Sequence, residues 1–373
     1  MSSDVSPTIA EIDLFALRNN AEIIKSRTNS KVLFVVKADA YGHGMVRCAQ
    51  ELERNGADYF GVAIASEGVR LRTAGINIPI LVFGGLSDFQ IDTYLDNNLT
   101  FTIPSVEKLQ AVDRRAIERN MQARIHIKID TGMGRLGTHW DRLDAFVVAA
   151  QNTSSLLVYE GIYSHFSDSE GNNDYTQIQY ERFIHACTTF KKGGIFFEIK
   201  HIANSGGITN HLDMKLDMVR SGLATYGLRG VTTDPIIEGL QPVLSLKTRV
   251  VFFKVVSKGE YVGYGSSWSP SATYERIVTL PVGYADGYAR ALGNKASVLI
   301  HGKRYPVIGR VSMDQSTVSL GQDGEAYNGD EVVLIGKQGD QEIHVEDLAQ
   351  ILDTISYEII CSIGERVPRV YIG

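Results

Sequence analysis

The stretch VLFVVKADAYGHG, residues 32–44, joins a continuous apolar run to a lysine and to a loop that contains two glycines. An uninterrupted Val/Leu/Phe run bounded by turn residues is typical of a strand buried on both faces, as in a parallel sheet. Lys37 follows this run directly. A charge at that position costs free energy unless a partner or a reaction uses it, so the stretch predicts a buried strand that ends in a functional lysine.

Seven further apolar runs follow, separated by connections long enough for a helix. They are YFGVA (59–63), ILVFG (80–84), TFTI (100–103), RIHIKI (124–129), VYEGIYSH (158–165), IKHIAN (199–204) and DMVRSG (217–222). Between two of these runs, SVEKLQAVDRRAIERN (105–120) carries apolar residues at helical spacing. Eight such strands predict an α/β fold, a (β/α)8 TIM-type barrel, with an open doubly wound sheet as the alternative that the pattern leaves open.

The pattern changes after residue 230, where alternating strands are joined by glycine-containing turns. The strand candidates are LSLKTRVVFFKVV, RIVTLPVG, ASVLIHGKRYPVIG and DEVVLIG, and only VEDLAQILD (345–353) looks helical. A chain of 373 residues is also longer than one core normally serves. We therefore expect a barrel domain over residues 1–234 and a mainly-β C-terminal domain over residues 235–373.

The composition argues against several classes of protein. A net charge of −6 gives no basic footprint for nucleic acid, and no apolar run approaches the ~20 residues of a membrane span. Cys48, Cys187 and Cys361 are scattered and form no CxxC, which is typical of a reducing compartment and not of disulfides or a thiolate metal site. The N-terminal residues also lack a secretory signal pattern, so we expect a cytoplasmic protein.

Polar and ionisable residues stand at the ends of five of the apolar runs. In a barrel, residues at the C-terminal ends of the strands line the active site. One such residue alone is ordinarily a surface residue, but the set favours a functional rim. Its members are Lys37, Lys128 with Asp130, His165, Asn204 with Ser205, and Arg220.

The rim suits a phosphate-bearing ligand better than a metal or a dinucleotide. No HExxH or His-x-His occurs, no GxGxxG follows the first strand, and no GxxxxGK[ST] is present, so no metal site is expected. ANSGG (203–207) and RSGL (220–223) follow the last two strands, where backbone amides of barrels often hold a phosphate. A buried nucleophilic lysine beside such a cradle suggests pyridoxal phosphate, and a phosphorylated sugar or acid substrate is the alternative.

VVKADAYGHG resembles the cofactor-lysine motif of alanine racemases, the fold-type III pyridoxal phosphate enzymes. Further segments resemble that family in its expected order and span both predicted domains. They are KIDTGMGRLG (128–137), YSHF (163–166), ANS (203–205), MVRSGLATYG (218–227), VGYGSSW (262–268), VGYADGY (282–288), GRVSMDQ (309–315) and SYEIICSIGERVPR (356–369).

The resemblance implies an isomerase that interconverts L- and D-alanine with pyridoxal 5'-phosphate and supplies D-alanine for cell-wall peptidoglycan. Three other readings stay open: a racemase of broader specificity that accepts serine, a related barrel decarboxylase, and a non-catalytic cofactor carrier. Such carriers lack the second β domain, and decarboxylases usually place an acidic residue where Arg220 stands. Tyr357 fits alanine, because racemases that prefer serine tend to have a smaller residue there.

Two catalytic residues are implied by the resemblance. Lys37 would bind the cofactor covalently and exchange a proton on the D-alanine face, and Tyr264 would do so on the opposite face. Racemisation needs two such groups, because a proton must leave one face of the α-carbon and return to the other. A tyrosine is a poor base unless its surroundings lower its pKa, and by resemblance His165, backed by an arginine, has this role.

The remaining implied residues surround the cofactor and the substrate. Tyr41, Ser205, Tyr357 and the amides of Gly222 and Leu223 would hold the phosphate, with Asn204 in the same cofactor site. Arg220 would face the pyridine nitrogen, with His201 behind it, and would leave that nitrogen unprotonated because a guanidinium does not give up its proton.

The substrate carboxylate would be bound by Arg135 and by the backbone amide of Met313. Lys128 would be carbamylated and hold that arginine, or would simply pair with Asp130. Tyr284, Arg290 and Arg310 fall in the channel through which the substrate enters. By resemblance, Tyr264 and Met313 would face Lys37 of a second subunit, which implies a head-to-tail homodimer with shared active sites.

Overall fold

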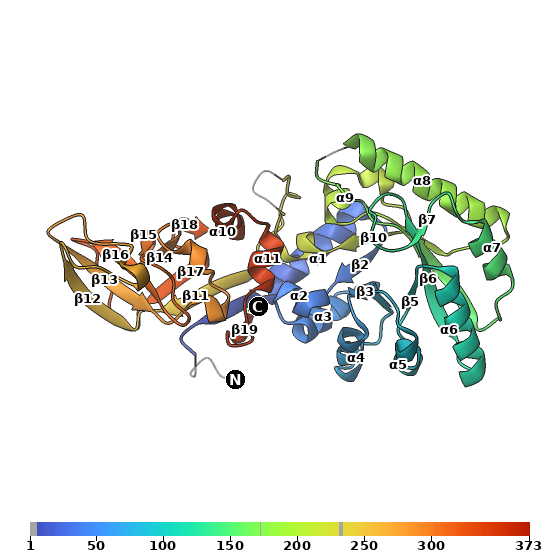
Figure 1. The fold of residues 1–373 in the computed structure, drawn as a ribbon, viewed down its shortest axis with the longest axis horizontal. Coiled ribbons are helices and arrows are strands. Elements are labelled where there is room, and N and C mark those ends of the chain that lie inside the picture. Colours follow the sequence, from blue (N-terminus) through green and yellow to red (C-terminus); the bar gives the residue numbers. More distant parts are fainter. Residues whose placement is uncertain (1–5, 172, 231–233) are drawn as a thin grey trace.

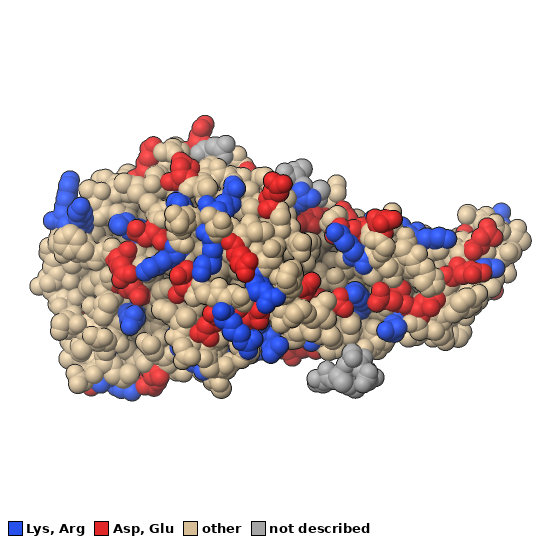
Figure 2. Space-filling model, turned by 180° about the vertical axis from the view of Figure 1, so that it is seen from behind, with Lys and Arg blue, Asp and Glu red and all other residues tan. Residues whose placement is uncertain are grey.

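The computed structural model describes residues 6–171, 173–230 and 234–373 and has two parts that lie end to end (Figure 1). One part is a barrel of strands surrounded by helices, and the other is an elongated body rich in strands. Acidic and basic side chains are interspersed over the face drawn in Figure 2. Within the described ranges, no helix has the length and apolar character needed to cross a membrane.

Eight parallel strands form the barrel at the positions of the eight apolar runs. They pair in two groups, in the orders β10-β2-β3-β4 and β5-β6-β8-β9. A parallel bridge between Leu81 and Thr100 joins β4 to the start of β5, and the amide of Arg220 donates to the carbonyl of Ala203 at 2.9 Å between β10 and the end of β9. The ring of strands therefore closes, which confirms the (β/α)8 barrel and excludes the open sheet. The strands are β2 (Lys31–Val35), β3 (Tyr59–Val62), β4 (Ile80–Val82), β5 (Phe101–Ile103), β6 (Ala123–Asp130), β8 (Leu157–Tyr163), β9 (Ile199–His201) and β10 (Met218–Ser221).

Helices cover the outside of the barrel. The helix predicted over residues 105–120 is α6 (Val106–Arg119). The hydroxyl of Ser105 accepts from the amide of Lys108 and caps its start, and Asn120 ends it in the left-handed conformation. The other helices of this part are α1 (Leu14–Thr28), α3 (Met45–Arg54), α4 (Ala65–Thr73), α5 (Ile91–Asp96), α7 (Asp144–Gln151), α8 (Asn173–Lys192) and α9 (Ser205–Asn210).

The second part is built on one ten-stranded sheet with the order β12-β13-β16-β15-β14-β17-β11-β1-β19, in which β18 also pairs with β17. Its strands confirm the mainly-β character of the C-terminal domain. They are β1 (Ile9–Asp13), β11 (Leu244–Arg249), β12 (Phe252–Ser257), β13 (Tyr274–Leu280), β14 (Ser297–Ile300), β15 (Lys303–Ile308), β16 (Ser316–Gly321), β17 (Glu331–Gln338), β18 (Gln341–Ile343) and β19 (Arg369–Ile372).

Two features of this part differ from the reading of the sequence. The expected helix over 345–353 is α10 (Val345–Leu352), but a second helix, α11 (Ser356–Cys361), follows it. No side chain caps the start of α11, so the sequence carries no start signal for it. Strand β1, which lies within residues 1–234, pairs with β11 and β19 and so joins the start of the chain to its end.

The segment after β2 is a left-handed turn. In α2 (Lys37–Tyr41), residues 38–41 all have positive φ, between 51° and 56°. Left-handed helical backbone costs about 1–2 kcal/mol per residue for L-amino acids, so surrounding contacts must stabilise it. Glu67 Oε1 accepts from the amide of Ala38 at 2.7 Å, and Arg369 Nε donates to the carbonyl of Gly42 at 2.9 Å.

Asp39 and His43, two polar residues of the opening stretch, also stabilise this turn. Asp39 Oδ1 accepts from the amide of Met45, the first residue of α3, at 3.0 Å. His43 Nδ1 lies 2.9 Å from the carbonyl oxygen of Ala40 and 3.0 Å from the carbonyl oxygen of the next residue. Burial lowers the pKa of His43 to about 4, so this imidazole is neutral and donates through Nδ1. Both residues therefore have structural roles.

Glycine is required where this turn meets the second part of the chain. Gly42 has φ 81°, and a Cβ built there would lie 2.3 Å from the carbonyl oxygen of Ile360 in α11. Gly75 has a similar φ of 88°, but a Cβ there would have no heavy atom within 4 Å. Alanine substitutions at the two glycines can therefore be compared. Both variants carry the cost of a positive φ, but only the variant at Gly42 also carries the cost of a close contact.

We expect Gly42→Ala to lower the free energy of unfolding by about 3 kcal/mol and Gly75→Ala to lower it by only about 1 kcal/mol. The excess at Gly42 arises because α11 must move away from the new methyl group. Urea unfolding followed by circular dichroism measures both values. Equal losses in the two variants would show that the contact with Ile360 does not limit the turn.

Candidate functional site

A cavity opens at the C-terminal ends of the barrel strands, which is where barrels place their active sites. Ten of the residues selected from the sequence line it together. They are Lys37, Tyr41, Lys128, Arg135, His165, Asn204, Ser205, Arg220, Gly222 and Tyr357, and the lining is completed by Val35, Phe83, Leu136 and Tyr163.

Lys37 stands where β2 passes into the left-handed turn and lines the cavity. Burial lowers the pKa of its ammonium group, and the nearby charge of Arg135 lowers it further. A lysine that loses its proton more readily is a better nucleophile toward an aldehyde. The position and the chemistry of Lys37 thus suit a covalent bond with a carbonyl compound.

Three hydrogen-bonding groups converge at the start of η3 (Leu223–Tyr226). Ser205 Oγ lies 3.0 Å from the amide nitrogen of Gly222. A Cβ on Gly222 would lie 2.7 Å from the hydroxyl oxygen of Tyr41, so only a glycine allows this approach. Burial raises the pKa of Tyr41, so its phenol stays a neutral donor. Two hydroxyls and a backbone amide at one point form a cradle for an anion such as phosphate.

Tyr357 reaches this cradle from α11, and its ring centroid lies 5.8 Å from that of Tyr41. Asn204 has a different contact, because its Oδ1 caps α9 by accepting from the amide of Gly207 at 2.9 Å. Leu223 is buried beside Gly222 and does not line the cavity.

Arg220 lies fully inside the barrel and lines the floor of the cavity. Its Nη2 donates to the carbonyls of Ser164 and Ile202 at 2.8 and 2.9 Å, and its Nη1 lies 3.1 Å from His201 Nδ1. Burial lowers the pKa of this guanidinium to about 10, which still leaves it charged at neutral pH. The site therefore contains one permanent, fixed cation.

His165 is held by the same guanidinium. Arg220 Nη2 lies 3.0 Å from His165 Nδ1, and an arginine can only donate. Burial and then the charge of Arg220 lower the pKa of His165 well below its usual value, so the imidazole is neutral. Its Nδ1 accepts and its Nε2 therefore carries the proton, an assignment inferred from the hydrogen-bond partner. His165 presents an N–H donor on the side away from Arg220.

Lys128 is buried beside this cation. Burial lowers the pKa of Lys128 to about 7, with a further contribution from the charge of Arg220. Its Nζ donates to the carbonyl of Ile129 at 3.1 Å and lies 5.0 Å from the ring centroid of Tyr163. A lysine with this pKa is largely neutral slightly above pH 7 and can react with carbon dioxide.

Asp130 instead organises the loop that carries Arg135. Its carboxylate accepts from the amides of Gly132 and Gly134, at distances of 2.9 and 3.1 Å. These bonds lower the pKa of Asp130 despite its partial burial, with a further contribution from the charge of Lys128. The loop places Arg135 at the cavity wall, where its guanidinium can bind a carboxylate.

One buried glutamine, which no sequence pattern indicates, joins the rim segments after β6 and β8. Gln179 of α8 accepts through Oε1 from the amide and the hydroxyl of Ser167, at 2.9 and 3.0 Å. Its Nε2 donates to the hydroxyl of Thr131 at 3.3 Å and to the carbonyl of His165 at 3.1 Å. Because all these bonds are long-range, only the folded chain reveals how the two segments are held.

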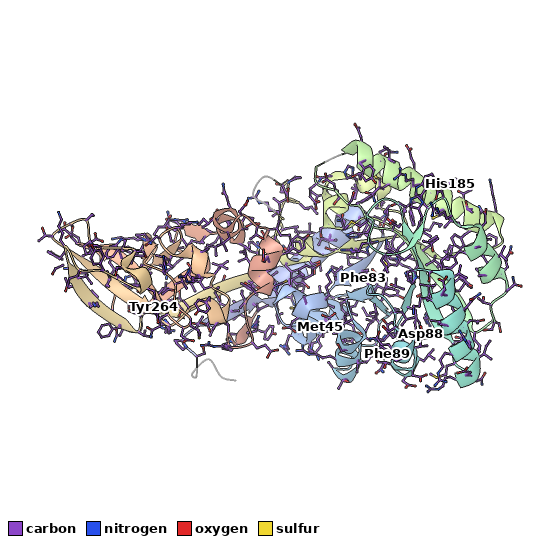
Figure 3. All side chains as sticks on the ribbon, in the orientation of Figure 1. Met45, Phe83, Asp88, Phe89, His185 and Tyr264 are labelled. Carbon is purple, nitrogen blue, oxygen red and sulfur yellow. The ribbon has the colours of Figure 1, made fainter. Side chains whose placement is uncertain are left out.

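The other predicted residues lie in loops of the second part and do not line this cavity. Tyr264 is 72% exposed and Met313 is 53% exposed. Figure 3 shows Tyr264 beside the β12–β13 end of the sheet, away from Phe83 of the cavity wall. These residues are Tyr264 of η4 (Tyr264–Ser266), Tyr284 of η5 (Tyr284–Asp286), Arg290 of η6 (Arg290–Leu292), Arg310 and Met313.

Backbone contacts bring these loops into a second cluster. The amide of Ala285 donates to the carbonyl of Met313 at 3.0 Å. A Cβ on Gly265 would lie 3.0 Å from a guanidinium nitrogen of Arg310, which places that arginine beside Tyr264. The predicted site residues thus form two groups within one chain. In the described ranges, no group of three or more His, Cys, Asp or Glu side chains is arranged to hold a metal ion.

Comparisons with known proteins agree with this geometry. The family model of the alanine racemase N-terminal domain matches residues 12–230. The family model of the alanine racemase C-terminal domain matches residues 243–371. An alanine racemase of Symbiobacterium thermophilum is 42% identical over 369 residues, which is 98% of this chain and 97% of the relative.

Solved structures have the same fold over the full chain. The alanine racemase of a D-cycloserine-producing Streptomyces lavendulae has a TM-score of 0.93 and 34% identity, covering 99% of this chain and 97% of that one. A histidine racemase of Leuconostoc mesenteroides subsp. sake has a TM-score of 0.91 and 27% identity, covering 100% of both chains. These matches, together with the barrel and its lysine-bearing cavity, show that the chain belongs to the alanine racemase family of pyridoxal 5'-phosphate-dependent isomerases.

Proposed function

We propose that this chain interconverts L- and D-alanine, with pyridoxal 5'-phosphate held in the barrel cavity. The observation that carries the proposal is the convergence in one cavity of a lysine with a lowered pKa, an anion cradle and a buried arginine. The full-length similarity to alanine racemases supports alanine as the substrate. In the cell, this activity would supply D-alanine for peptidoglycan.

The cavity residues fit the cofactor. Tyr41, Ser205, Tyr357 and the amides of Gly222 and Leu223 would hold its phosphate, because the first two and Gly222 converge at one point. Lys37 would bind its aldehyde carbon, and Arg220 would face its ring nitrogen. When bound, the cofactor withdraws electrons from the α-carbon of the amino acid and makes the α-proton acidic.

Arg220 favours racemisation over decarboxylation, the second reaction considered for this barrel. A charged guanidinium can only donate, so it cannot pass a proton to the ring nitrogen as an acidic residue would. No Asp or Glu is among the described residues that line the cavity, so none of them offers a carboxylate for this role. A weaker electron sink suits exchange of a proton better than loss of carbon dioxide.

The two proton-transfer groups proposed are Lys37 and Tyr264, one for each face of the α-carbon. The N–H that His165 presents would stabilise the deprotonated tyrosine. Arg135 and the amide of Met313 would bind the substrate carboxylate, and Tyr284, Arg290 and Arg310 would line the access channel.

The separation of the two residue clusters supports a homodimer. Tyr264 and Met313 are exposed in loops of the second part, whereas Lys37 lies in the barrel cavity. We therefore propose that the loop cluster of one chain completes the cavity of another. The proposed domains, 1–234 and 235–373, would then each contribute to a different site, and the gap between the two family matches supports this division. A cytoplasmic location is supported by the three free cysteines.

Incubation of the purified holoenzyme with L-alanine in deuterated water tests the activity. We expect D-alanine with deuterium at the α-carbon, detected by chiral chromatography and mass spectrometry. Tyr264→Phe should slow this conversion at least 100-fold while the visible absorbance of the bound cofactor persists, because Lys37 is intact. Tyr261→Phe, an exposed tyrosine three residues away, is the matched control and should be active.

Parallel incubations with L-serine and L-histidine test the breadth of specificity. Release of carbon dioxide, or no turnover of any amino acid, would contradict the proposed function. Faster turnover of serine or histidine than of alanine would show that this amino acid, and not alanine, is the preferred substrate. The chain would still be an amino-acid racemase.

Mixing two inactive variants tests the shared sites. In a dimer that pairs Lys37→Ala with Tyr264→Phe, one cavity has both defects and the other has both native groups. Random subunit exchange should therefore restore about a quarter of the wild-type activity. Each variant alone should stay inactive. No recovery after verified subunit exchange would show that both groups act within one chain.

Lys128 is proposed to carry a carbamate that holds Arg135. Its neutral amine would form a bond to the carbon of carbon dioxide and release a proton. Since the pKa of Lys128 is about 7, protonation below that pH should suppress the reaction. We expect a carbamate signal in 13C NMR with labelled bicarbonate that strengthens as the pH rises through about 7 and is absent from Lys128→Arg. Lys200→Arg, at an exposed lysine, is the control; an unchanged signal in Lys128→Arg would assign the carbamate elsewhere.

A further inference from the structure

A chain of hydrogen bonds leads from Arg220 through the barrel interior to Glu160. Arg220 Nη1 lies 3.1 Å from His201 Nδ1, and His201 Nε2 lies 2.9 Å from His126 Nδ1. His126 Nε2 lies 3.3 Å from Glu160 Oε2. Arg220 belongs to β10, His201 to β9, His126 to β6 and Glu160 to β8. These four strands are neighbours in the ring, in the order β6-β8-β9-β10. Arg220, His201 and His126 are buried, and the Glu160 side chain is 11% exposed.

The two ends of this chain fix its direction. Arg220 can only donate, so His201 Nδ1 must accept and carry no proton. Burial and then the charge of Arg220 lower the pKa of His201 well below its usual value, so this imidazole is neutral and its proton is on Nε2. His201 therefore donates to His126 Nδ1, and His126 donates through Nε2 to Glu160.

Glu160 is held as an acceptor at the far end. The hydroxyl of Tyr59 donates to Glu160 Oε2 at 2.7 Å, and Arg124 Nη1 donates to Oε1 at 3.3 Å. Although burial opposes it, the hydrogen bonds from His126 and Tyr59 lower the pKa of Glu160 to about 2. An ionised carboxylate can only accept, so both ends demand the same direction.

A reversed chain fails at Arg220. If His126 placed its proton on Nδ1, His201 Nε2 would have to accept from it, and the proton of His201 would move to Nδ1. Two donors would then face each other at 3.1 Å, between His201 and Arg220. An unmatched buried donor costs about 1–3 kcal/mol, and more when one group is charged. Glu160 adds to this cost, because reversal would also leave its carboxylate facing an unprotonated His126 Nε2.

We propose that Glu160 is a positioning residue, which orients Arg220 through His126 and His201. Its carboxylate fixes the protonated nitrogen of each imidazole, so that His201 offers Arg220 an acceptor and orients the guanidinium in the cavity floor. The consequence for the cofactor rests on the proposed placement of its ring nitrogen against Arg220. A glutamate ordinarily lies on the surface and has no specific role there. Glu160 instead contacts Tyr59, His126 and Arg124 inside and beside the barrel.

The histidine nitrogens report directly on this proposal. In apoprotein labelled with 15N-histidine, we expect the wild type to carry the proton of both His126 and His201 on Nε2. Glu160→Leu removes the acceptor, so His126 should shift its proton to Nδ1 in a substantial fraction of molecules, and His201 should respond. Glu160→Gln retains a carbonyl oxygen that can accept from His126 and should preserve the wild-type pattern.

Arg124→Met is the matched control, because it removes the half-exposed partner of Glu160 and leaves the acceptor in place. It should preserve both protonation patterns. If Glu160→Leu does not fold, His126→Phe interrupts the same chain one step closer to Arg220, and His201 should change in the same way. Unchanged His201 nitrogens in folded Glu160→Leu or His126→Phe would overturn the proposal, as would a Glu160→Gln variant that behaves like Glu160→Leu.

Cofactor binding gives the second measurement. A misplaced guanidinium should raise the dissociation constant of pyridoxal phosphate about tenfold in Glu160→Leu, a change of about 1.4 kcal/mol, and alter the absorbance of the bound cofactor. Glu160→Gln and Arg124→Met should bind it as the wild type does. Changed imidazoles with unchanged cofactor binding would overturn the link to Arg220. The apoprotein spectra do not depend on racemase activity, so a wild type inactive on alanine would refute the proposed function alone.

Discussion

Arg220 carries a positive charge into the barrel, where its side chain is almost fully buried. Removal of a charge from water costs several kcal/mol unless hydrogen bonds replace the lost solvation. Here two backbone carbonyls and two imidazoles do so, because Ser164 and Ile202 accept from the guanidinium and His165 and His201 face it with unprotonated nitrogens. The charge therefore requires both histidines to stay neutral. It also disfavours further cations, and it contributes to the lowered pKa of Lys128. Burial and this one fixed charge thus together set the protonation states of the two histidines and Lys128.

The left-handed turn after β2 is the second feature, after the buried charge of Arg220, that determines the shape of the cavity. It turns the chain so that Lys37 and Tyr41 both line the cavity, at a cost in backbone strain. The compensating contacts come from both parts of the chain: Glu67 belongs to the barrel, whereas Arg369 lies in β19 of the second sheet. Tyr357 reaches the same cavity from α11. The cavity is therefore formed only when the barrel and the second part pack together.

Much of the fold could be predicted because its signals are local. A buried parallel strand is a short apolar run, and Ser105 and Asn120 mark the ends of α6 by their side-chain chemistry. The pairing of β1 with β11 and β19 has no local signal, since its partners lie more than 200 residues away. The strand-end rule also found most of the cavity wall. It could not find Gln179, His126 or Glu160, because each acts through hydrogen bonds to residues from other strands or loops. Asp39 and His43 likewise act through the backbone of their turn, whose left-handed conformation has no signal in the sequence.

The exposed loop cluster is the part of the chain whose physical chemistry points to a second copy. Tyr264 and Met313 leave large apolar side chains in water, and their burial against another surface would be favourable by roughly 25 cal/mol per Å² of apolar area. Racemisation needs a group on each face of the α-carbon, and the described cavity supplies Lys37 on one side. A head-to-tail pair would answer both requirements, because each chain has a cavity in its barrel and an exposed tyrosine in its second part. Such a pair would close on itself after two copies, so that both cavities would be completed and neither exposed cluster would be left free to bind a third copy.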